Sequence, residues 1–190
     1  AQSPPAVVLQ VLHLEFGYEG VPIFRSFSAS IPAGVGWIGG DESRGKTTLL
    51  KLLAAEFKPH AGDIRLGDTR AVVQPLAYRS QVFWTDPRTQ AFDAMTPIEY
   101  WKGIEQRYAS FAPALLSELV EGLALAPHLE KSLHMLSTGT KRKVFLAAAF
   151  ASGAVVTLLD EPFAALDKSS AGLVLELLEE AASHQSRLWL

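Results

Sequence analysis

Cysteine is missing from this chain of 190 residues. Its absence excludes disulfide bonds, metal sites built on thiolates and cysteine nucleophiles. A chain without cysteine suits the reducing cytosol, where disulfide bonds rarely persist. Any catalytic group must therefore come from other residue types.

Long apolar runs and an excess of basic residues are also lacking. The longest apolar stretch, 144–159, is shorter than the ~18 residues that cross a bilayer, and Ser152 and Gly153 interrupt it. Residues 1–10 lack the charged start and long apolar run of a signal peptide, so we expect any membrane role to come through a partner. The 17 Lys and Arg residues face 20 Asp and Glu residues, a net charge of −3, which argues against nucleic-acid binding.

The composition is that of an ordinary globular protein, with 48% hydrophobic and 19% charged residues. A chain of this length can bury one good core, so we predict a single domain over residues 1–190. The motif from Thr96 to Glu99 has the form of a helix capping box with proline at the first helical position, and a second helix is expected after Pro113. We predict a helical insert over about 96–135 and a core made of 1–95 and 136–190.

Apolar and polar residues alternate loosely over 6–16 and 22–32, which predicts two antiparallel strands joined by a turn. Short apolar runs predict further strands, and apolar spacing of helical period predicts three more helices. The strands are expected at 35–38 (a buried strand), 63–66, 82–84, 155–159 and from 187 onward, and the helices at 47–57, 139–152 and 168–184. Strands that alternate with helices indicate an α/β fold with a largely parallel sheet.

A phosphate-binding loop is predicted between the strand at 35–38 and the helix that follows. Backbone N–H groups around its glycines can surround phosphate oxygens, Lys46 can reach the β- and γ-phosphates, and Thr47 can bind Mg²⁺. At average residue frequencies, the pattern G-x-x-x-x-G-K-[ST] arises by chance in roughly 1% of chains of this length, so nucleotide binding is favoured over a simple glycine turn. The nucleotide site is assigned to Gly40, Asp41, Glu42, Ser43, Arg44, Gly45, Lys46, Thr47 and the next residue, Thr48.

Two carboxylates end a second apolar segment. Residues 155–159 predict a buried strand that delivers Asp160 at its end, where the carboxylate could hold Mg²⁺ through water. Glu161 would then be placed to polarise an attacking water molecule. Alone, this pattern could equally be a strand that ends in two solvated carboxylates. Together with a phosphate loop, the catalytic interpretation is favoured.

A third segment of interest, 136–140, lies just before a predicted helix and reads L-S-T-G-T. Serine, glycine and a helix N-terminus together can bind an anion such as phosphate. Ser137 taken alone favours a simpler role as a helix cap. The basic residues Lys141, Arg142 and Lys143 are interpreted as a charged first turn of the helix.

These three segments in this order resemble the ATP-binding cassette (ABC) transporter ATPases, over residues 7–190. The segment 136–140 is similar to the family's L-S-G-G-Q signature, and 160–167, with D-E-P and then A-L-D, resembles the acidic strand and the D-loop that ends at Asp167. Phe16-Gly17-Tyr18 matches the family's aromatic segment, which makes Tyr18 the base-stacking candidate. The resemblance implies a P-loop NTPase fold of the ABC type, with a mainly parallel sheet core, an N-terminal antiparallel β portion and an α-helical subdomain.

The resemblance also implies a mechanism. Two identical or homologous domains pair head to tail, and each ATP lies between one phosphate loop and the partner's signature. This pair lies at the cytoplasmic face of the membrane, and its closure moves integral membrane permease subunits. Hydrolysis assisted by Glu161 reopens the pair. ATP and Mg²⁺ are the implied cofactors, and no nucleic acid is implied. The segment 161–167 is similar to small export-type ATPases, including the haem-exporter ATPase of cytochrome c biogenesis. The ATP bound at the partner's phosphate loop would be contacted by the signature residues Ser137, Thr138, Gly139 and Thr140.

Three features depart from the family pattern. Thr138 and Thr140 replace a glycine and a glutamine of the signature. The family uses a Q-loop glutamine to bind Mg²⁺. The candidates for this position are Gln90, which is slightly favoured, and Asp86, and the alternative that neither residue contacts the metal stays open. A switch histidine is expected after the last predicted strand, where the sequence ends, so hydrolysis could be impaired or the natural chain could continue.

Two other functions stay open. A non-hydrolysing nucleotide-binding regulatory module would fit the altered signature, although the intact phosphate loop and acidic pair argue against it. A soluble ABC ATPase of DNA repair or translation would need a long coiled-coil insertion or a second cassette, and residues 96–135 show no sustained heptads. In a transporter, the insert and the segment 85–96 are expected to face the permease, with Phe92 and Met95 as candidate contacts, although a role in the core is equally open for either residue.

Overall fold

The computed structural model describes residues 6–40 and 45–190, which form two compact units. The first unit contains the residues up to Trp84 together with Val155–Leu158 and Ala181–Leu190, and the second contains Thr85–Ala154 and Leu159–Glu180. Both sheets belong to the first unit, and the regular elements described in the second unit are helices. The predicted insert, 96–135, lies within the second unit, which extends beyond it on both sides.

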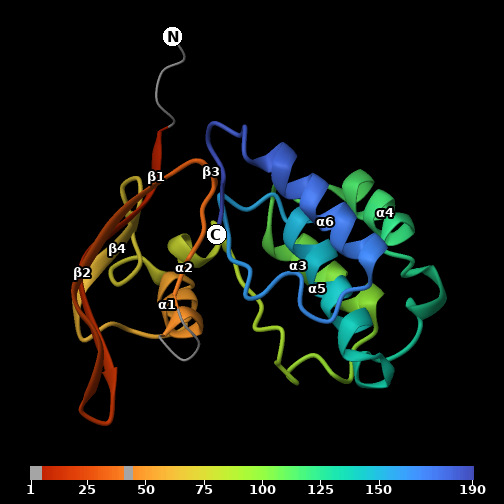
Figure 1. Cartoon of the computed structure of the whole chain (residues 1–190), viewed down its shortest axis with the longest axis horizontal. Coiled ribbons are helices and arrows are strands. Elements are labelled where there is room, and N and C mark those ends of the chain that lie inside the picture. The colour runs from red at the N-terminus through yellow and green to blue at the C-terminus, as the bar shows by residue number, and fades with distance from the viewer. Residues whose placement is uncertain (1–5, 41–44) are drawn as a thin grey trace. The chain divides into compact units, whose positions relative to one another are not determined.

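An antiparallel sheet with strand order β2-β1-β4-β5 forms one part of the first unit. Its strands are β1 (Val7–Tyr18), β2 (Val21–Pro32), β4 (Ala61–Leu66) and β5 (Thr69–Arg70). The long strands β1 and β2 run side by side in Figure 1, and Glu19 and Gly20, both at positive φ, join them. Two positive φ values give a turn whose twist matches that of antiparallel strands. The predicted hairpin is confirmed.

A second sheet in the same unit is parallel throughout, with strand order β3-β8-β7-β6. Its strands are β3 (Gly34–Val35), β8 (Leu188–Trp189), β7 (Val156–Thr157) and β6 (Val82–Phe83). The predicted α/β class with a largely parallel sheet is confirmed. The prediction of a buried strand over 35–38 is wrong, because β3 ends at Val35, which is 44% exposed, and Trp37 is 84% exposed. The reason is that β3 lies at the edge of the described sheet, with β8 beside it.

Two helices complete the first unit and close its core. They are α1 (Lys46–Leu53) and the short α2 (Pro75–Arg79). Leu52 and Leu53 of α1 belong to the same core of buried side chains as Leu9 of β1. Tyr78 of α2 is also fully buried and donates a hydrogen bond to the carbonyl oxygen of Leu53 at 2.7 Å. The helix ends before the predicted residue 57 because Ala55 adopts a positive φ, which a right-handed helix cannot contain.

Asp63 on β4 is a buried carboxylate held by two arginines of the same sheet. Its Oδ2 accepts hydrogen bonds from Nε of Arg65 at 2.7 Å and from Nε of Arg70 at 2.6 Å. Burial alone would raise the pKa of Asp63, but the hydrogen bonds and charges of the two guanidinium groups outweigh it and hold the pKa below its ordinary value. The ionised carboxylate therefore stabilises the folded sheet.

Replacing Asp63 with Asn is expected to lower the free energy of unfolding at neutral pH by about 1.5–3 kcal/mol, the usual range for hydrogen bonds to charged groups. Because the folded-state pKa is lowered, this stabilisation is present above the unfolded-state pKa of about 3.9 and is lost as the pH falls through the folded-state pKa. Urea unfolding of both proteins at neutral and strongly acidic pH measures the difference, which should shrink in acid. Asp68→Asn, at an exposed turn carboxylate, is the control, and a pH-independent loss would contradict the prediction.

The second unit surrounds one buried helix. Its elements are α3 (Pro97–Arg107), α4 (Pro113–Gly122), α5 (Thr138–Ala151), α6 (Lys168–Ala181) and the 3₁₀ helices η1 (Ala126–His128) and η2 (Leu133–Met135). The predicted capping box is confirmed, since Thr96 Oγ1 accepts from the Glu99 N–H at 3.2 Å and the Glu99 carboxylate accepts from the Thr96 N–H at 2.8 Å. α5 contacts α3 and α4 and is buried on all sides over 144–151, as a helix apolar all round should be (Figure 1).

Candidate functional site

Lys46 and the start of α1 form the described part of the phosphate loop. The Nζ of Lys46 donates a hydrogen bond to the carbonyl oxygen of Gly40 at 2.7 Å, so the two ends of the motif lie close together. α1 has no side-chain cap at its N-terminus and no acidic residue in its first turn, and a helix start of this kind favours an anion such as phosphate. The assigned residues Asp41, Glu42, Ser43 and Arg44 lie outside the described residues.

Gly45, which precedes α1, is a structural requirement of the motif. Its φ of 88° lies in the left-handed region that favours glycine. A Cβ atom at this position would lie 2.6 Å from Cγ2 of Ile23 on β2. Gly45 therefore allows the chain to enter α1 at a point that lies close to the antiparallel sheet.

Tyr18, the base-stacking candidate, lies beside the first turn of α1. Its hydroxyl oxygen is 3.1 Å from Oγ1 of the buried Thr48. The residue is 45% exposed, and its ring meets the Phe16 ring edge-on, with the centroids 5.2 Å apart. Thr48 thus holds Tyr18 in place next to the phosphate loop, where an exposed aromatic ring is suited to a nucleobase.

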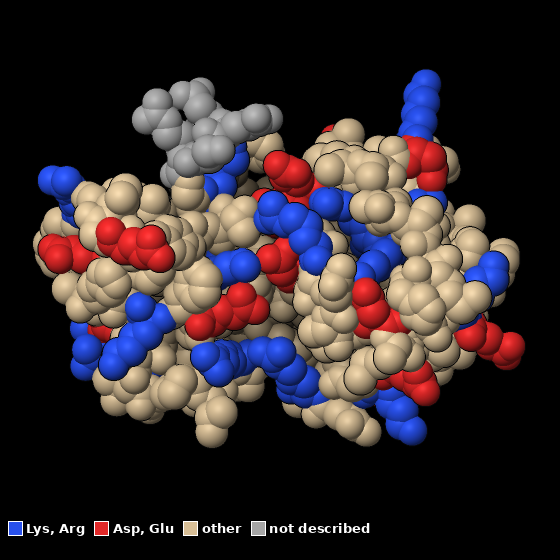
Figure 2. All heavy atoms as spheres, turned by 90° about the horizontal axis from the view of Figure 1, so that it is seen from below, with Lys and Arg blue, Asp and Glu red and all other residues tan. Residues whose placement is uncertain are grey.

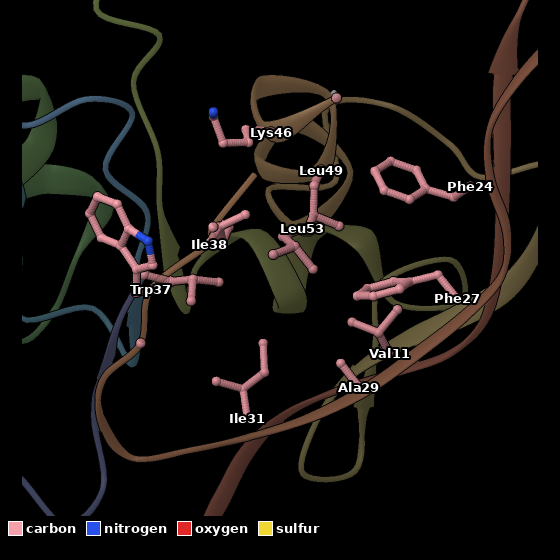
Figure 3. Close-up of a pocket in the computed structure, with 14 residues that line it drawn as sticks. Val11, Phe24, Phe27, Ala29, Ile31, Trp37, Ile38, Lys46, Leu49 and Leu53 are labelled. Carbon is pink, nitrogen blue, oxygen red and sulfur yellow. The ribbon is translucent and has the colours of Figure 1, made fainter. Parts of the chain in front are cut away.

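An apolar cavity of about 450 Å³ lies between α1 and the antiparallel sheet. Phe24, Phe27 and Leu53 point into it, and Lys46 lies at its border (Figure 3). Its lining is otherwise apolar, so the cavity cannot replace the water around phosphate oxygens. The start of α1 is therefore a better candidate for phosphate binding than this cavity.

We call the segment from Asp160 to Ala165 the acidic turn. Its two carboxylates, on Asp160 and Glu161, differ in their surroundings. The Asp160 side chain is only 8% exposed, and its Oδ2 accepts a hydrogen bond from Nη2 of Arg88 at 2.7 Å. The Glu161 residue is exposed and has a φ of 50°, which residues other than glycine adopt infrequently. One carboxylate is held by an arginine, and the other belongs to a residue that is open to water.

The two Q-loop candidates lie in different surroundings. Asp86 Oδ1 accepts a hydrogen bond from Nε of Arg88 at 3.3 Å, so one guanidinium joins Asp86 to Asp160. Gln90 is exposed, and its backbone carbonyl oxygen accepts a hydrogen bond from the backbone N–H of Asp93 at 3.1 Å. Asp86 is therefore the candidate that lies near the acidic turn. The role of Arg88 could not be predicted from the sequence, because its partner Asp160 lies 72 residues further along the chain.

The signature segment forms the N-terminus of α5. Ser137 caps the helix, as its residue type alone predicts, since its Oγ accepts the N–H of Thr140 at 3.1 Å. Gly139 faces the acidic turn so closely that a Cβ atom there would lie 2.4 Å from the carbonyl oxygen of Ala165. Thr138 is exposed, and the Thr140 hydroxyl is 2.9 Å from Ser137 Oγ. This packing requires glycine at 139 and leaves room for threonine at 138.

The three basic residues after the signature are more than a charged first turn, so that interpretation is wrong. Lys141 pairs with Asp93, and Lys143 pairs with Asp167. Arg142 is 9% exposed and donates hydrogen bonds to the backbone of the acidic turn. Charged side chains at the start of a helix that is apolar all round need partners. The apolar run after these residues was the signal in the sequence, because it indicates a buried helix whose charged side chains need partners.

Asp167, the D-loop candidate, lies directly before α6. Its Oδ1 accepts the N–H of Ser170 at 2.9 Å, as a helix-capping carboxylate does. The hydrogen bond from Lys143 lowers the pKa of the Asp167 carboxyl, and the bonds from Ser170 add to this effect. Asp167 therefore stays ionised at neutral pH and links the start of α6 to the first turn of α5.

The described residues offer donors that suit Mg²⁺. A Mg²⁺ ion that is bound mainly by phosphate oxygens and water needs only one or two protein oxygens. Thr47 in the first unit and Asp160 in the second unit each carry an oxygen donor of the kind that Mg²⁺ prefers. Over 6–40 and 45–190, no group of three or more acidic or histidine side chains could hold a metal ion by itself.

Within the same ranges no helix is both long enough and apolar enough to span a bilayer. Figure 2 shows basic and acidic side chains interspersed on the visible face.

Comparison with known proteins gives consistent results. The sequence model of the ABC transporter family matches residues 27–164. The cytochrome c biogenesis ATP-binding export protein CcmA of Pseudomonas savastanoi pv. phaseolicola is 30% identical over 184 residues, which cover 96% of this chain and 84% of that protein. CcmA of Legionella pneumophila is 31% identical and covers 91% of this chain and 86% of its own length. A solved ATP-binding subunit of an ABC transporter shares the fold, with a TM-score of 0.82 at 23% identity, over 96% of this chain and 78% of that structure.

Proposed function

The chain belongs to the ABC transporter family, and from this premise we propose that it serves as the ATP-binding subunit of an export-type transporter. ATP binding and hydrolysis are the activities that membership in this family implies. The observation that carries the proposal is the presence, inside the matched region, of the phosphate loop at α1, the signature at α5 and the acidic pair Asp160 and Glu161 after β7. The two units together would make one ATPase domain.

The phosphates of ATP are assigned to Lys46 and the start of α1. The Lys46 ammonium can exchange its bond with the Gly40 carbonyl for stronger bonds with the β- and γ-phosphates. The N-terminus of α1 adds the positive end of its dipole. Thr47 and Asp160 would hold Mg²⁺, which neutralises charge on the phosphates when bound.

Glu161 is proposed as the general base of hydrolysis. Its exposed carboxylate can accept a proton from the water molecule that attacks the γ-phosphate. Asp160 is less suited to this task, because its carboxylate is nearly buried and accepts a hydrogen bond from Arg88. The two acidic residues would therefore divide their roles between the metal and the water.

A second copy of the chain, or a homologous subunit, is proposed to complete each site. Ser137 and Gly139 at the start of α5 would contact the γ-phosphate of ATP bound at the phosphate loop of the partner subunit. These contacts exist only while the γ-phosphate is present, so ATP favours the closed pair and hydrolysis favours the open one. This difference is what could drive a membrane partner.

The membrane partner is proposed to contact an exposed apolar patch of the second unit. The patch consists of Met95, Ile98 and Met135, which are 42%, 50% and 64% exposed. A backbone hydrogen bond of 2.8 Å from the first residue of η2 to Met95 holds the two segments together. Phe92, the other candidate, packs on Tyr100 with the ring centroids 4.9 Å apart. Clustered apolar side chains on a surface favour protein contacts, and we assign this patch to permease subunits at the cytoplasmic face of a membrane.

Release of phosphate from Mg-ATP by the purified chain tests this function. The expected result is saturable, Mg²⁺-dependent release whose rate per subunit rises with protein concentration, because each site needs two subunits. A non-hydrolysing regulatory module would bind ATP without releasing phosphate. That outcome would overturn the proposed enzymatic role while leaving the nucleotide site intact.

Replacing Tyr18 with Ala is expected to weaken ATP binding about 5- to 150-fold, because stacking of a base on an aromatic ring contributes about 1–3 kcal/mol. Tyr18→Phe keeps the ring and loses only the contact with Thr48, so its affinity should stay within about threefold of the wild type. Isothermal titration calorimetry measures both. Tripolyphosphate, which has no base, is the control ligand, and an equal loss of its affinity would contradict stacking.

A further inference from the structure

The first turn of α5 contacts the acidic turn at several neighbouring points. Gly139 packs against the carbonyl of Ala165. The Nη1 of Arg142 donates to the carbonyl oxygen of Asp160 at 3.1 Å and also to the carbonyl oxygen of Glu161. Lys143 pairs with Asp167, two residues after the turn. The signature end of α5 and the acidic turn therefore form one continuous contact within the second unit.

We propose that Arg142 is a positioning residue that fixes the backbone of Glu161 and thereby joins the signature helix to the hydrolytic base. This inference rests on the proposed function, which assigns the base to Glu161. Glu161 has a left-handed backbone, with a φ of 50°, a conformation that persists only when its surroundings hold it. The guanidinium of Arg142 supplies that constraint, since it donates to the carbonyl oxygens of the two peptide units that flank the Cα atom of Glu161.

The burial of Arg142 makes this constraint effective. With 9% of the residue exposed, water cannot easily replace its hydrogen bonds, and a hydrogen bond in such surroundings is stronger than one in water. Burial lowers the pKa of Arg142, although the charges of Glu161 and Asp160 oppose the shift. The side chain is long and rigid at its end, which suits it to hold two carbonyl groups at once.

The acceptors of Arg142 distinguish positioning from simple charge pairing. Arg142 donates to backbone carbonyl oxygens, whereas Arg88 donates to the Asp160 carboxylate. The Glu161 carboxylate is consequently left exposed and able to act on water. Movement of α5 would shift the Glu161 backbone directly, because the bonds are made from the turn of α5 that follows Ser137 and Gly139. Contact of the signature with the partner's ATP would thus reach the base of the same subunit.

Replacing Arg142 with Gln tests the proposal. We expect kcat for ATP hydrolysis to fall at least about 10-fold, with KM and ATP affinity within about twofold of the wild type, because misplacement of a catalytic group acts on the chemical step. Arg142→Lys, which can still donate to both carbonyls, should recover part of the loss. The matched control is Arg107→Gln, at an exposed arginine over the Tyr108 ring, which should behave as the wild type.

Hydrogen exchange gives a readout that does not depend on activity. The N–H of Ala164 donates to the Glu161 carbonyl at 3.0 Å, so loosening of the turn should speed its exchange in Arg142→Gln and, less so, in Arg142→Lys. If the wild type released no phosphate, the proposed function would fail, and exchange would still decide the positioning role. Unchanged exchange at 160–165, or a kcat within twofold of the wild type, would overturn the proposal. If Arg142→Gln does not fold, the lysine variant carries both measurements.

Discussion

The Glu161→Gln protein is expected to bind Mg-ATP as tightly as the wild type and to release phosphate at least about 100-fold more slowly. The amide has nearly the size of the carboxylate but cannot accept a proton from water. The turn should stay intact, because Arg142 binds the backbone carbonyl of Glu161 and the exposed side chain is free to change. Phosphate-release kinetics and calorimetric titration measure the two quantities.

Without hydrolysis, the ATP-bound pair should accumulate. Light scattering of Glu161→Gln is therefore expected to show a shift from monomer to dimer when Mg-ATP is added. Glu179→Gln, at an exposed glutamate of α6, is the matched control and should hydrolyse ATP as the wild type does. A monomer that still binds ATP would contradict the role of Ser137 and Gly139. Rapid turnover by Glu161→Gln would contradict the assignment of the base.

Replacing Lys46 with Met is expected to weaken ATP binding about 10- to 100-fold, since hydrogen bonds between charged groups contribute about 1.5–3 kcal/mol. The folded state should be little affected, because Lys46 makes an exposed bond with the Gly40 carbonyl. Titration with ATP measures the affinity, and Lys58→Met, at an exposed lysine after α1, is the control. An unchanged affinity for ATP together with a lost affinity for adenosine would contradict phosphate binding by Lys46.

Features that depend on nearby residues could be predicted from the sequence. The hairpin of β1 and β2 follows from alternation and from the turn between the strands. The start of α3 follows from Thr96 and Glu99, which satisfy each other's backbone N–H groups within one turn. The phosphate loop is a local pattern too, because its glycine, lysine and threonine act on one ligand.

Features that depend on distant partners could not be predicted. A short apolar run can be a central or an edge strand, and only its neighbours decide, so the exposure of Trp37 was missed. The pairing of Arg88 with Asp160 and the binding of two carbonyls by Arg142 join segments that have no common pattern. The elements α2 and β5 were missed because they are too short to show a period.

The strand order of the parallel sheet has a consequence for synthesis of the chain. β3 begins at Gly34, and the strand beside it, β8, begins at Leu188. The antiparallel sheet, whose strands all precede residue 71, can form early on the ribosome, because its contacts are comparatively local. The parallel sheet cannot join β3 to β7 until β8 has emerged. Its assembly is therefore expected to be the late, slow step of folding, and nascent chains that stall before β8 would expose β3 to aggregation.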